Sequence, residues 1–587
     1  NGTEVKTGNM QLNVNGNDAT GLYLANGAGA DGKVVLDKET TISVTGEGGT
    51  IAVIDGNYYD INGNATGKKS DKTTLTSKAH LKSGGTDDNI AKNAIGYKLI
   101  NGGVLNHDGN IDFSKADNAT GIRVETGTVN NTTDITVNGV GVDIYGKNSV
   151  VNNTGNITAN NGTAAVRLNK DASMTIGGKG KILGENSADA VRAHSGSNVK
   201  LDNANIEVTG SGSGLHLLNT DDDSGAFKLS GTGTINVSGE NASGLKLEAD
   251  DGKGGVMMAK SKLDTSGAGG TTINVKDKGG NGIVTNTSGD VISGMNVNIE
   301  SAEGESALVV LGGTKNITQS GKLTSASDHS VVDLTALRND FSFTNSGTVT
   351  AGASGMAVDA HQNSNIRFTN GGTISGKSVL GGGNNTIALS GNTSDIATGH
   401  GDNTIEMLGK AVTGILTAGN GNNTVTLNGG TKLQTGTVGN GQNNVILKNV
   451  SEAQSDALFG NLKAGSGKQD ALTLQGKASH YVLQDSSKIS GFEKLNIEEG
   501  RFELRNTDIT LNELTADDGI TVKQGGELFI NQNKADTFAH QLQGDGLVTT
   551  STAGQAFDFN NKSAAFAGDN FIGTLRLTNG TFDIAGD

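Results

Sequence analysis

Short stretches in which apolar and polar residues alternate recur along almost the whole chain. Each unit contains an apolar-x-apolar pair, a polar turn, a Gly or small residue and a second apolar-x-apolar pair, as in IDFSKADNATGIRV from Ile111 and INVSGENASGLKL from Ile235. Such alternation predicts a β-strand with one buried face, and the intervening Gly and Asn residues tolerate the positive φ angles of sharp corners. The pattern therefore predicts short strands joined by tight corners.

The units repeat at the length of one coil of a β-solenoid. From Ile111 the successive starts are separated by 24, 22, 25, 24 and 29 residues. One coil cannot bury its apolar face alone, so neighbouring coils must stack in parallel around a shared core. The repeat predicts an all-β fold, a parallel β-helix (β-solenoid) of about two dozen coils that is on the order of 110–120 Å long at the usual strand spacing.

Two kinds of departure from the repeat divide the predicted helix. The stretches near residues 55–95 and 249–270 interrupt the alternation, and we expect them to project as loops. Between residues 381 and 447 the coils shorten to 18–20 residues and carry Gly-x-Gly corners followed by Asn, as in GNGNNTVTL from Gly419. We expect these asparagines to point inward and to form ladders between coils.

The composition changes near residue 450. Ten of the 15 phenylalanines follow that position, within the last 137 residues. Because Phe buries more apolar area than Val or Ile, this end should be the more stable part and should cap the helix. We predict a β-helix region over residues 1–450 and a Phe-rich C-terminal β-helix end over residues 451–587.

Composition and charge exclude several classes of protein. The 587 residues include 91 Gly but no Pro and no Cys. Pro would interrupt the hydrogen bonds of a parallel stack, and the absence of Cys excludes disulfides, thiolate metal sites and Cys nucleophiles. The formal net charge of −16 argues against a nucleic-acid partner. The chain contains no apolar run of membrane-spanning length and opens without a signal segment, so we expect a mature or trimmed product.

The C-terminal segments GFEKLNIEEGRFEL from Gly491 and LQGDGLVTTSTAGQAFDFNN from Leu542 are similar to the autochaperone end of AIDA-type autotransporter passengers. These are Gram-negative adhesins exported by type V secretion, and the chain resembles their UpaB-like members most. The resemblance implies a right-handed β-helix, display at the cell surface, and membrane contact only through a C-terminal barrel that this sequence lacks. It also implies an autochaperone-like core formed by Phe557, Phe559, Phe566, Phe571 and Phe582.

Parallel β-helices also occur in carbohydrate-active enzymes, which gives an alternative from another class. The segments NTDDD at residues 219–223 and GHG at residues 399–401 resemble polygalacturonase signatures. About eight coils, about 40 Å, separate them, whereas catalytic carboxylates must converge within about 10 Å. The Gly-x-Gly coils resemble calcium-binding repeats, but only Asp402 supplies a carboxylate there. We expect no catalytic residue, no metal and no cofactor.

One surface feature does suggest a binding site. In each second apolar-x-apolar pair, the middle residue should point to solvent and lie beside its equivalent in the next coil. Reading this position along the chain gives Arg123, Asp143, Arg167, Arg192, His216 and Lys246. A linear polyanion could contact several of these cations, with weak, salt-sensitive binding that strengthens below about pH 6.5 as His216 takes a proton. The alternative is a solvated face whose cations pair with nearby acids such as Glu125 and Glu248.

Together these observations predict a cell-surface adhesin without enzymatic activity. The expected partners are a host matrix protein or an anionic glycan such as a glycosaminoglycan, contacted by Arg123, Arg167, Arg192, His216 and Lys246. A second possibility is association with an identical passenger on a neighbouring cell, which would cause aggregation and biofilm formation.

Overall fold

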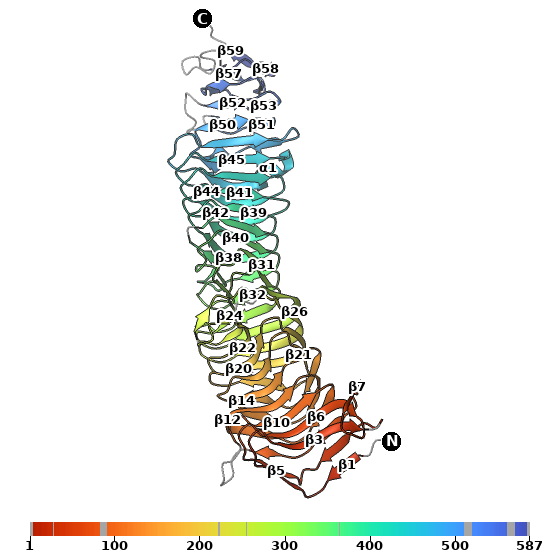
Figure 1. The fold of residues 1–587 in the computed structure, drawn as a ribbon. Coiled ribbons are helices and arrows are strands. Elements are labelled where there is room, and N and C mark those ends of the chain that lie inside the picture. The colour runs from red at the N-terminus through yellow and green to blue at the C-terminus, as the bar shows by residue number, and fades with distance from the viewer. Residues whose placement is uncertain are drawn as a thin grey trace. The chain divides into compact units, whose positions relative to one another are not determined.

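The computed structural model describes residues 4–27, 29–82, 91–220, 224–253, 255–362, 364–509, 519–559 and 570–583. The chain is 58% strand and 2% helix, and its strands pair almost entirely in parallel, which confirms the predicted all-β parallel β-helix (Figure 1). None of the helices among the described residues is long and apolar enough to cross a membrane. The strands group into two compact units, one of residues 1–336 and 350–355, the other of residues 337–349 and 356–587. The change in composition near residue 450 lies inside the second unit.

In the first unit, each coil contributes strands to three parallel stacks. The stack that carries the predicted binding residues runs through β3 (Thr20–Gly27), β6 (Thr50–Tyr59), β10 (Ile95–Ile100), β12 (Ile111–Val124), β14 (Ile135–Ile144), β17 (Ala164–Leu168), β20 (Asp189–His194), β22 (Ser213–Thr220) and β24 (Ser243–Asp250). Most of their inward side chains, including Ile122, Val142 and Val166, are buried. The alternation seen in the sequence is therefore the alternation between core and surface.

Both interruptions of the repeat contain antiparallel pairs. Strand β7 (Ala65–Lys69) pairs with the end of β6, and β25 (Val256–Met257) pairs with the end of β24. Both predicted loops are shorter than expected. In the first, β8 (Thr74–Ser77) pairs in parallel with the coils on both sides of it, and in the second, β26 (Leu263–Val275) already pairs in parallel with the coil before it. Residues 263–270 thus belong to the stack, which corrects the predicted boundary at residue 270.

In the second unit, the Gly-x-Gly coils stack as predicted. Strands β39 (Thr386–Leu389), β41 (Thr404–Met407), β43 (Thr424–Asn428), β45 (Asn444–Lys448) and β47 (Ala471–Gln475) pair in register. The asparagine before each of the first four strands is buried, and its Nδ2 donates to the equivalent residue of the next coil at 2.8 Å, through Asn385, Asn403, Asn423 and Asn443 to Asp470. We call this series the amide ladder.

Aromatic side chains fill much of the core near the C-terminal end. Phe502, Phe557 and Phe559 are buried, as predicted. Phe529 is an exception, because it lies outside the core with the Arg501 guanidinium 5.2 Å from its ring centroid. Phe571 is half-buried. Phe566 and the side chain of Phe582 lie outside the described residues, so the autochaperone-like core as a whole stays a prediction.

Candidate functional site

The middle residues of the apolar-x-apolar pairs form a single row along the stack of strands from β10 to β24. Register pairing places Lys98 of β10 beside Arg123 of β12, and the series continues from strand to strand through Asp143, Arg167, Arg192, His216 and Lys246. We call these seven residues the charged row. The predicted alignment is confirmed, and Lys98 extends it by one strand.

The local sequence explains why the row points outward. In β12, Ile122 and Val124 flank Arg123 and are both fully buried, so the Arg123 side chain must leave the opposite face of the strand. Gly121 lies at the corner before it, where a Cβ atom would come within 2.7 Å of the Gly141 carbonyl oxygen in the next coil. Glycine at this corner therefore lets the coils approach closely enough to align the row.

The row is less exposed than the sequence predicts. The Lys and Arg side chains retain only 24–34% of their exposure and His216 only 11%. Three carboxylates lie beneath them and are almost completely buried: Asp143, Asp189 and Glu248. The middle residues thus leave the outer face of the sheet but are only partly exposed, because each buried acid draws neighbouring cations down against the sheet. The expected pairing with Glu125 and Glu248 is present.

Asp143 pairs with the cations on both sides. Arg167 donates from Nε and Nη2 to the two carboxylate oxygens of Asp143, at 2.9 and 2.8 Å. Arg123 is held less firmly, because its Nε lies 3.7 Å from Asp143 Oδ2 and donates no hydrogen bond among the described residues. The Arg123 guanidinium instead lies 5.3 Å from the centroid of the Tyr145 ring. The Nε atom is itself buried, so an external anion could reach Arg123 only through the 28% of its side chain that stays exposed.

His216 lies between two buried carboxylates. Its Nδ1 is 2.8 Å from Asp189 Oδ2, and its Nε2 is 3.0 Å from Glu248 Oε1. Burial lowers the pKa of His216, but the hydrogen bonds to Asp189 and Glu248 outweigh it and raise the pKa above its ordinary value. His216 therefore takes its proton at a higher pH than an ordinary histidine, which moves the expected strengthening of binding to a higher pH than the sequence predicts.

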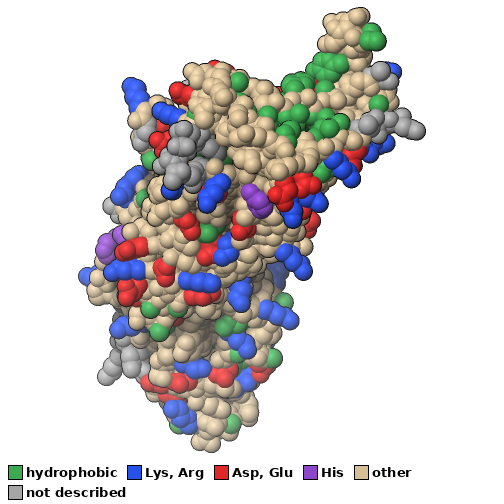
Figure 2. All heavy atoms as spheres, turned by 90° about the horizontal axis from the view of Figure 1, so that it is seen from below, with side chains coloured by type: hydrophobic (Ala, Val, Ile, Leu, Met, Phe, Trp, Pro, Cys, Tyr) green, Lys and Arg blue, Asp and Glu red, His purple; other side chains and the backbone are tan. Residues whose placement is uncertain are grey.

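The arrangement places positive charge above negative charge. Arg192 pairs with Asp189 at 2.7 Å, Lys246 with Glu248 at 2.9 Å, and Lys98 with the more exposed Glu125 at 3.0 Å. With His216 protonated, cations outnumber carboxylates in the row and its partners, and the cations lie outside the buried Asp143, Asp189 and Glu248, whereas Glu125 is more exposed than Lys98. The row can therefore offer several anchored donors to an anion. Elsewhere acidic and basic side chains intermingle over the surface (Figure 2).

The chain matches no family model, no curated protein and no solved structure. The candidate site is therefore defined by its own geometry.

The two enzyme-like segments belong to different units of the chain. Residues 221–223 lie outside the described residues, and His400 is exposed on a short coil of the second unit. Asp402 Oδ1 accepts a hydrogen bond from the backbone N–H of Asn422 at 2.7 Å. Among the described residues, no group of three His, Asp or Glu side chains is placed to hold a metal ion.

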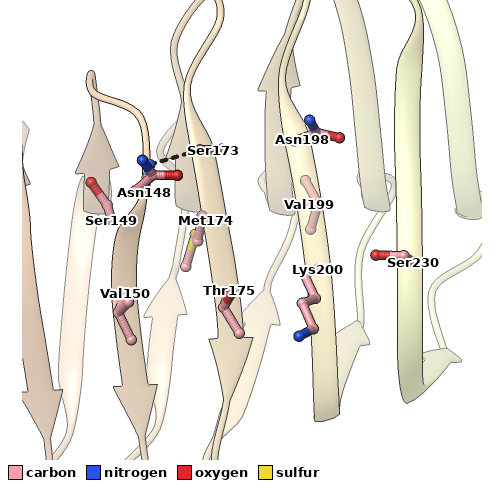
Figure 3. A pocket seen from close by; sticks show the side chains of 10 residues that line it. All are labelled: Asn148, Ser149, Val150, Ser173, Met174, Thr175, Asn198, Val199, Lys200 and Ser230. Carbon is pink, nitrogen blue, oxygen red and sulfur yellow. Dashed lines mark hydrogen bonds between the residues drawn. The ribbon is translucent and has the colours of Figure 1, made fainter.

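A shallow hollow of about 300 Å³ lies on a different face of the first unit. Figure 3 shows its lining residues on β15 (Ser149–Asn153), β18 (Ser173–Gly177), β21 (Asn198–Val208) and β23 (Phe227–Val237) and in the turns before them. Most are short polar side chains, and Lys200 is the one charged residue of the lining. This hollow lacks the paired acids that glycoside hydrolysis requires.

Sequence reasoning missed Lys98, Asp189 and Tyr145. Lys98 follows the first interruption of the repeat, where the coil pattern is harder to align, although IGYKLI from Ile95 has the same spacing. Asp189 aligns with Thr120 of β12 and Val140 of β14, which carry no charge. The sequence of its own coil therefore does not indicate that Asp189 pairs with the row. Such contacts depend on the neighbouring coil, which periodicity alone does not describe.

Proposed function

We propose that this chain is the exported passenger of a cell-surface adhesin and that its charged row binds an anionic host polysaccharide, such as a sulfated glycosaminoglycan. The observation that supports the proposal is the row itself: cations at one position of strands about 5 Å apart, with Asp143 between Arg123 and Arg167. A linear chain of acidic sugars presents its charges in a comparable series.

The energetics favour a polymer over a small anion. An exposed ion pair contributes only about 0.2–1 kcal/mol, because water and salt screen it. Contacts to one continuous chain act together, since each bound group raises the effective concentration of the next. Because the carboxylates beneath the row already hold the cations in place, little side-chain entropy remains to be lost on binding.

The test must spare the cations that stabilise the fold. Removing Arg167 would leave the buried Asp143 with the more distant Arg123, at a cost of about 3–5 kcal/mol. Removing Arg192 would leave Asp189, which is less exposed than Glu248, with the histidine that the two acids share. Lys98, Arg123 and Lys246 are safer, since Glu125 is half exposed, Asp143 keeps Arg167 and Glu248 keeps His216. The matched control changes three exposed lysines elsewhere in the first unit to Gln: Lys179, Lys200 and Lys228.

We expect the variant Lys98→Gln, Arg123→Gln, Lys246→Gln to bind heparin about tenfold more weakly than the parent in low salt, which corresponds to about 1.4 kcal/mol. The control variant, with the same change in net charge, should bind like the parent. Affinity would be measured by calorimetry at low and high salt, with the β-sheet spectrum as a check on folding. Equal loss in both variants, or no loss in either, would refute the charged row as the binding site.

A further inference from the structure

An exposed tyrosine extends the charged row beyond its cations. Tyr23 of β3 pairs in register with Val53 of β6, and Val53 pairs with Lys98 of β10. Tyr23 therefore occupies the same row as the cations, two strands or about 10 Å from Lys98. It is 53% exposed, whereas Val53 between them is buried. An aromatic ring thus lies open to solvent at one end of the row.

The Tyr23 ring is held in place from below. Its hydroxyl donates to Asp55 Oδ2 at 2.6 Å, and the Tyr59 hydroxyl donates to the same oxygen at 2.7 Å. The other oxygen, Oδ1, accepts from the Asn57 N–H and from Asn101 Nδ2, each at 2.9 Å. Burial raises the pKa of Asp55, but these four hydrogen bonds lower it overall, so the anchor is ionised at neutral pH.

A tyrosine whose hydroxyl is anchored while its ring stays exposed is better suited to binding a ligand than to packing in the core. A surface tyrosine normally samples several rotamers, and fixing one of them on binding costs free energy. Here Asp55, which is 1% exposed, fixes the end of the side chain in advance while the ring remains open to solvent. The face of Tyr23 is therefore a preorganised aromatic surface continuous with a line of cations.

We infer that the exposed face of Tyr23 is a subsite for a sugar ring of the polysaccharide that the charged row binds. The inference rests on the proposed function for the acidic nature of that polysaccharide. The C–H face of a sugar ring is apolar and weakly positive, which matches the negative face of an aromatic ring. Lys98 and Arg123 follow in the row, so the acidic groups of the next sugars would meet cations.

The Tyr23 subsite would distinguish a polysaccharide from other polyanions, which the charge of the row alone does not do. A polyanion without rings gains only the ion pairs of the row, whereas a polysaccharide also gains the stacking contact on Tyr23. The experiment therefore compares heparin with inorganic polyphosphate, and adds uncharged dextran fragments to isolate the stacking. The variants are Tyr23→Ala, which removes the ring, Tyr23→Phe, which keeps the ring but not its anchor, and Ile61→Ala, a control at a 98% exposed apolar residue.

We expect Tyr23→Ala to weaken heparin binding about fivefold and to leave polyphosphate binding unchanged, with Tyr23→Phe between it and the parent. Dextran fragments should bind weakly to the parent and to the variant that lacks Lys98, Arg123 and Lys246, but not to Tyr23→Ala. Ile61→Ala should match the parent throughout.

The outcomes separate the two proposals. If the parent binds dextran through Tyr23 but heparin no better than dextran, the charged row fails and the sugar subsite stands. If heparin binding depends on the row while Tyr23→Ala binds every polymer as the parent does, the subsite is refuted. Equal loss of heparin and polyphosphate binding in Tyr23→Ala would also refute it, since the ring would then act on the row rather than on sugar.

Discussion

At the scale of single residues, Asp470 ends the amide ladder. In the preceding coils the equivalent side chain is Asn, whose Nδ2 can donate to glycine carbonyls of its own coil, as Asn423 does to Gly419 and Gly421 at 2.8 and 2.9 Å. Asp470 Oδ1 accepts from Asn443, but Oδ2 is buried and has no hydrogen-bond partner among the described residues. Burial raises the pKa of Asp470, against the lowering effect of the Asn443 hydrogen bonds.

Asp470→Asn should therefore stabilise the second unit at neutral pH. The amide keeps the accepting oxygen and replaces an unsatisfied carboxylate oxygen, whose burial costs about 1–3 kcal/mol, with a donor. Because the folded pKa is raised, the penalty is present above that pKa and disappears in acid, so the gain should shrink as the pH falls. Thermal melts at pH 7 and pH 4 would measure it, with the exposed Asp402→Asn as control. A lower melting temperature for Asp470→Asn at pH 7 would contradict this account.

At the scale of strands, a second polar ladder lies inside the first unit. His107 of β11 (Gly103–His107) pairs with Asn131 of β13 (Gly127–Asn131), which pairs with Asn153 of β15. The His107 Nδ1–H donates to Asn131 Oδ1 at 2.6 Å, and Asn131 Nδ2 donates to Asn153 Oδ1 at 2.7 Å. His107 is 1% exposed, and its Nε2 has no partner among the described residues. Burial lowers the pKa of His107 to about 4.

This histidine should make the surrounding coils sensitive to acid. Between about pH 6.5 and pH 4 the unfolded chain binds a proton at this histidine that the folded chain does not bind. The free energy of unfolding therefore decreases as the pH is lowered, by about 3 kcal/mol in total. His107→Asn extends the asparagine series and should remove that loss. Hydrogen exchange of the β11 and β13 amides at pH 7 and pH 4.5 would measure local opening, with exposed His400→Asn as control. Equal acid sensitivity in the parent and His107→Asn would disprove the assignment.

The alternation in the sequence predicts the strands and their order, but not how deeply the polar side chains on them are buried. Alternation located the charged row because its neighbours Ile122 and Val124 must face the core. It did not reveal the burial of Asp143, since that depends on how Arg167 of the next coil folds over it. It also missed α1 (Glu452–Leu458), although Ser451 and Gln454 form a helix-start signature in which Gln454 Oε1 accepts from the Ser451 N–H at 3.0 Å.

At the scale of the whole molecule, stability should differ along the chain. Near the C-terminal end, Tyr481 packs between Phe459 and Phe502, with ring centroids 5.8 and 5.3 Å apart. All three rings are buried. Large aromatic side chains contribute more apolar burial per coil than the Val and Ile residues of the first unit.

Limited proteolysis should therefore leave a resistant fragment from the part of the chain after residue 450. In a repeat protein, folding begins in the most stable coils and spreads to their neighbours, so this region should also refold first. Mass spectrometry of fragments over a series of urea concentrations would identify the surviving core. Survival of a fragment from residues 1–250 instead would show that stability lies at the opposite end.

The charged row also affects how the coils find their correct neighbours during folding. In a chain of similar coils, a strand can stack on the wrong coil and leave one coil out. Apolar packing distinguishes poorly between a strand and its neighbour one coil further on, and misassembly is a common failure of repeat proteins. If β17 stacked directly on β12, Arg167 would lie beside Arg123 without the carboxylate of Asp143 between them. If β22 stacked on β17, His216 would lose Asp189 and face Arg167. Like charges side by side destabilise a strand pair, so Asp143 between Arg123 and Arg167, and Asp189 beside Arg192 and His216, favour the correct order over these two skipped arrangements.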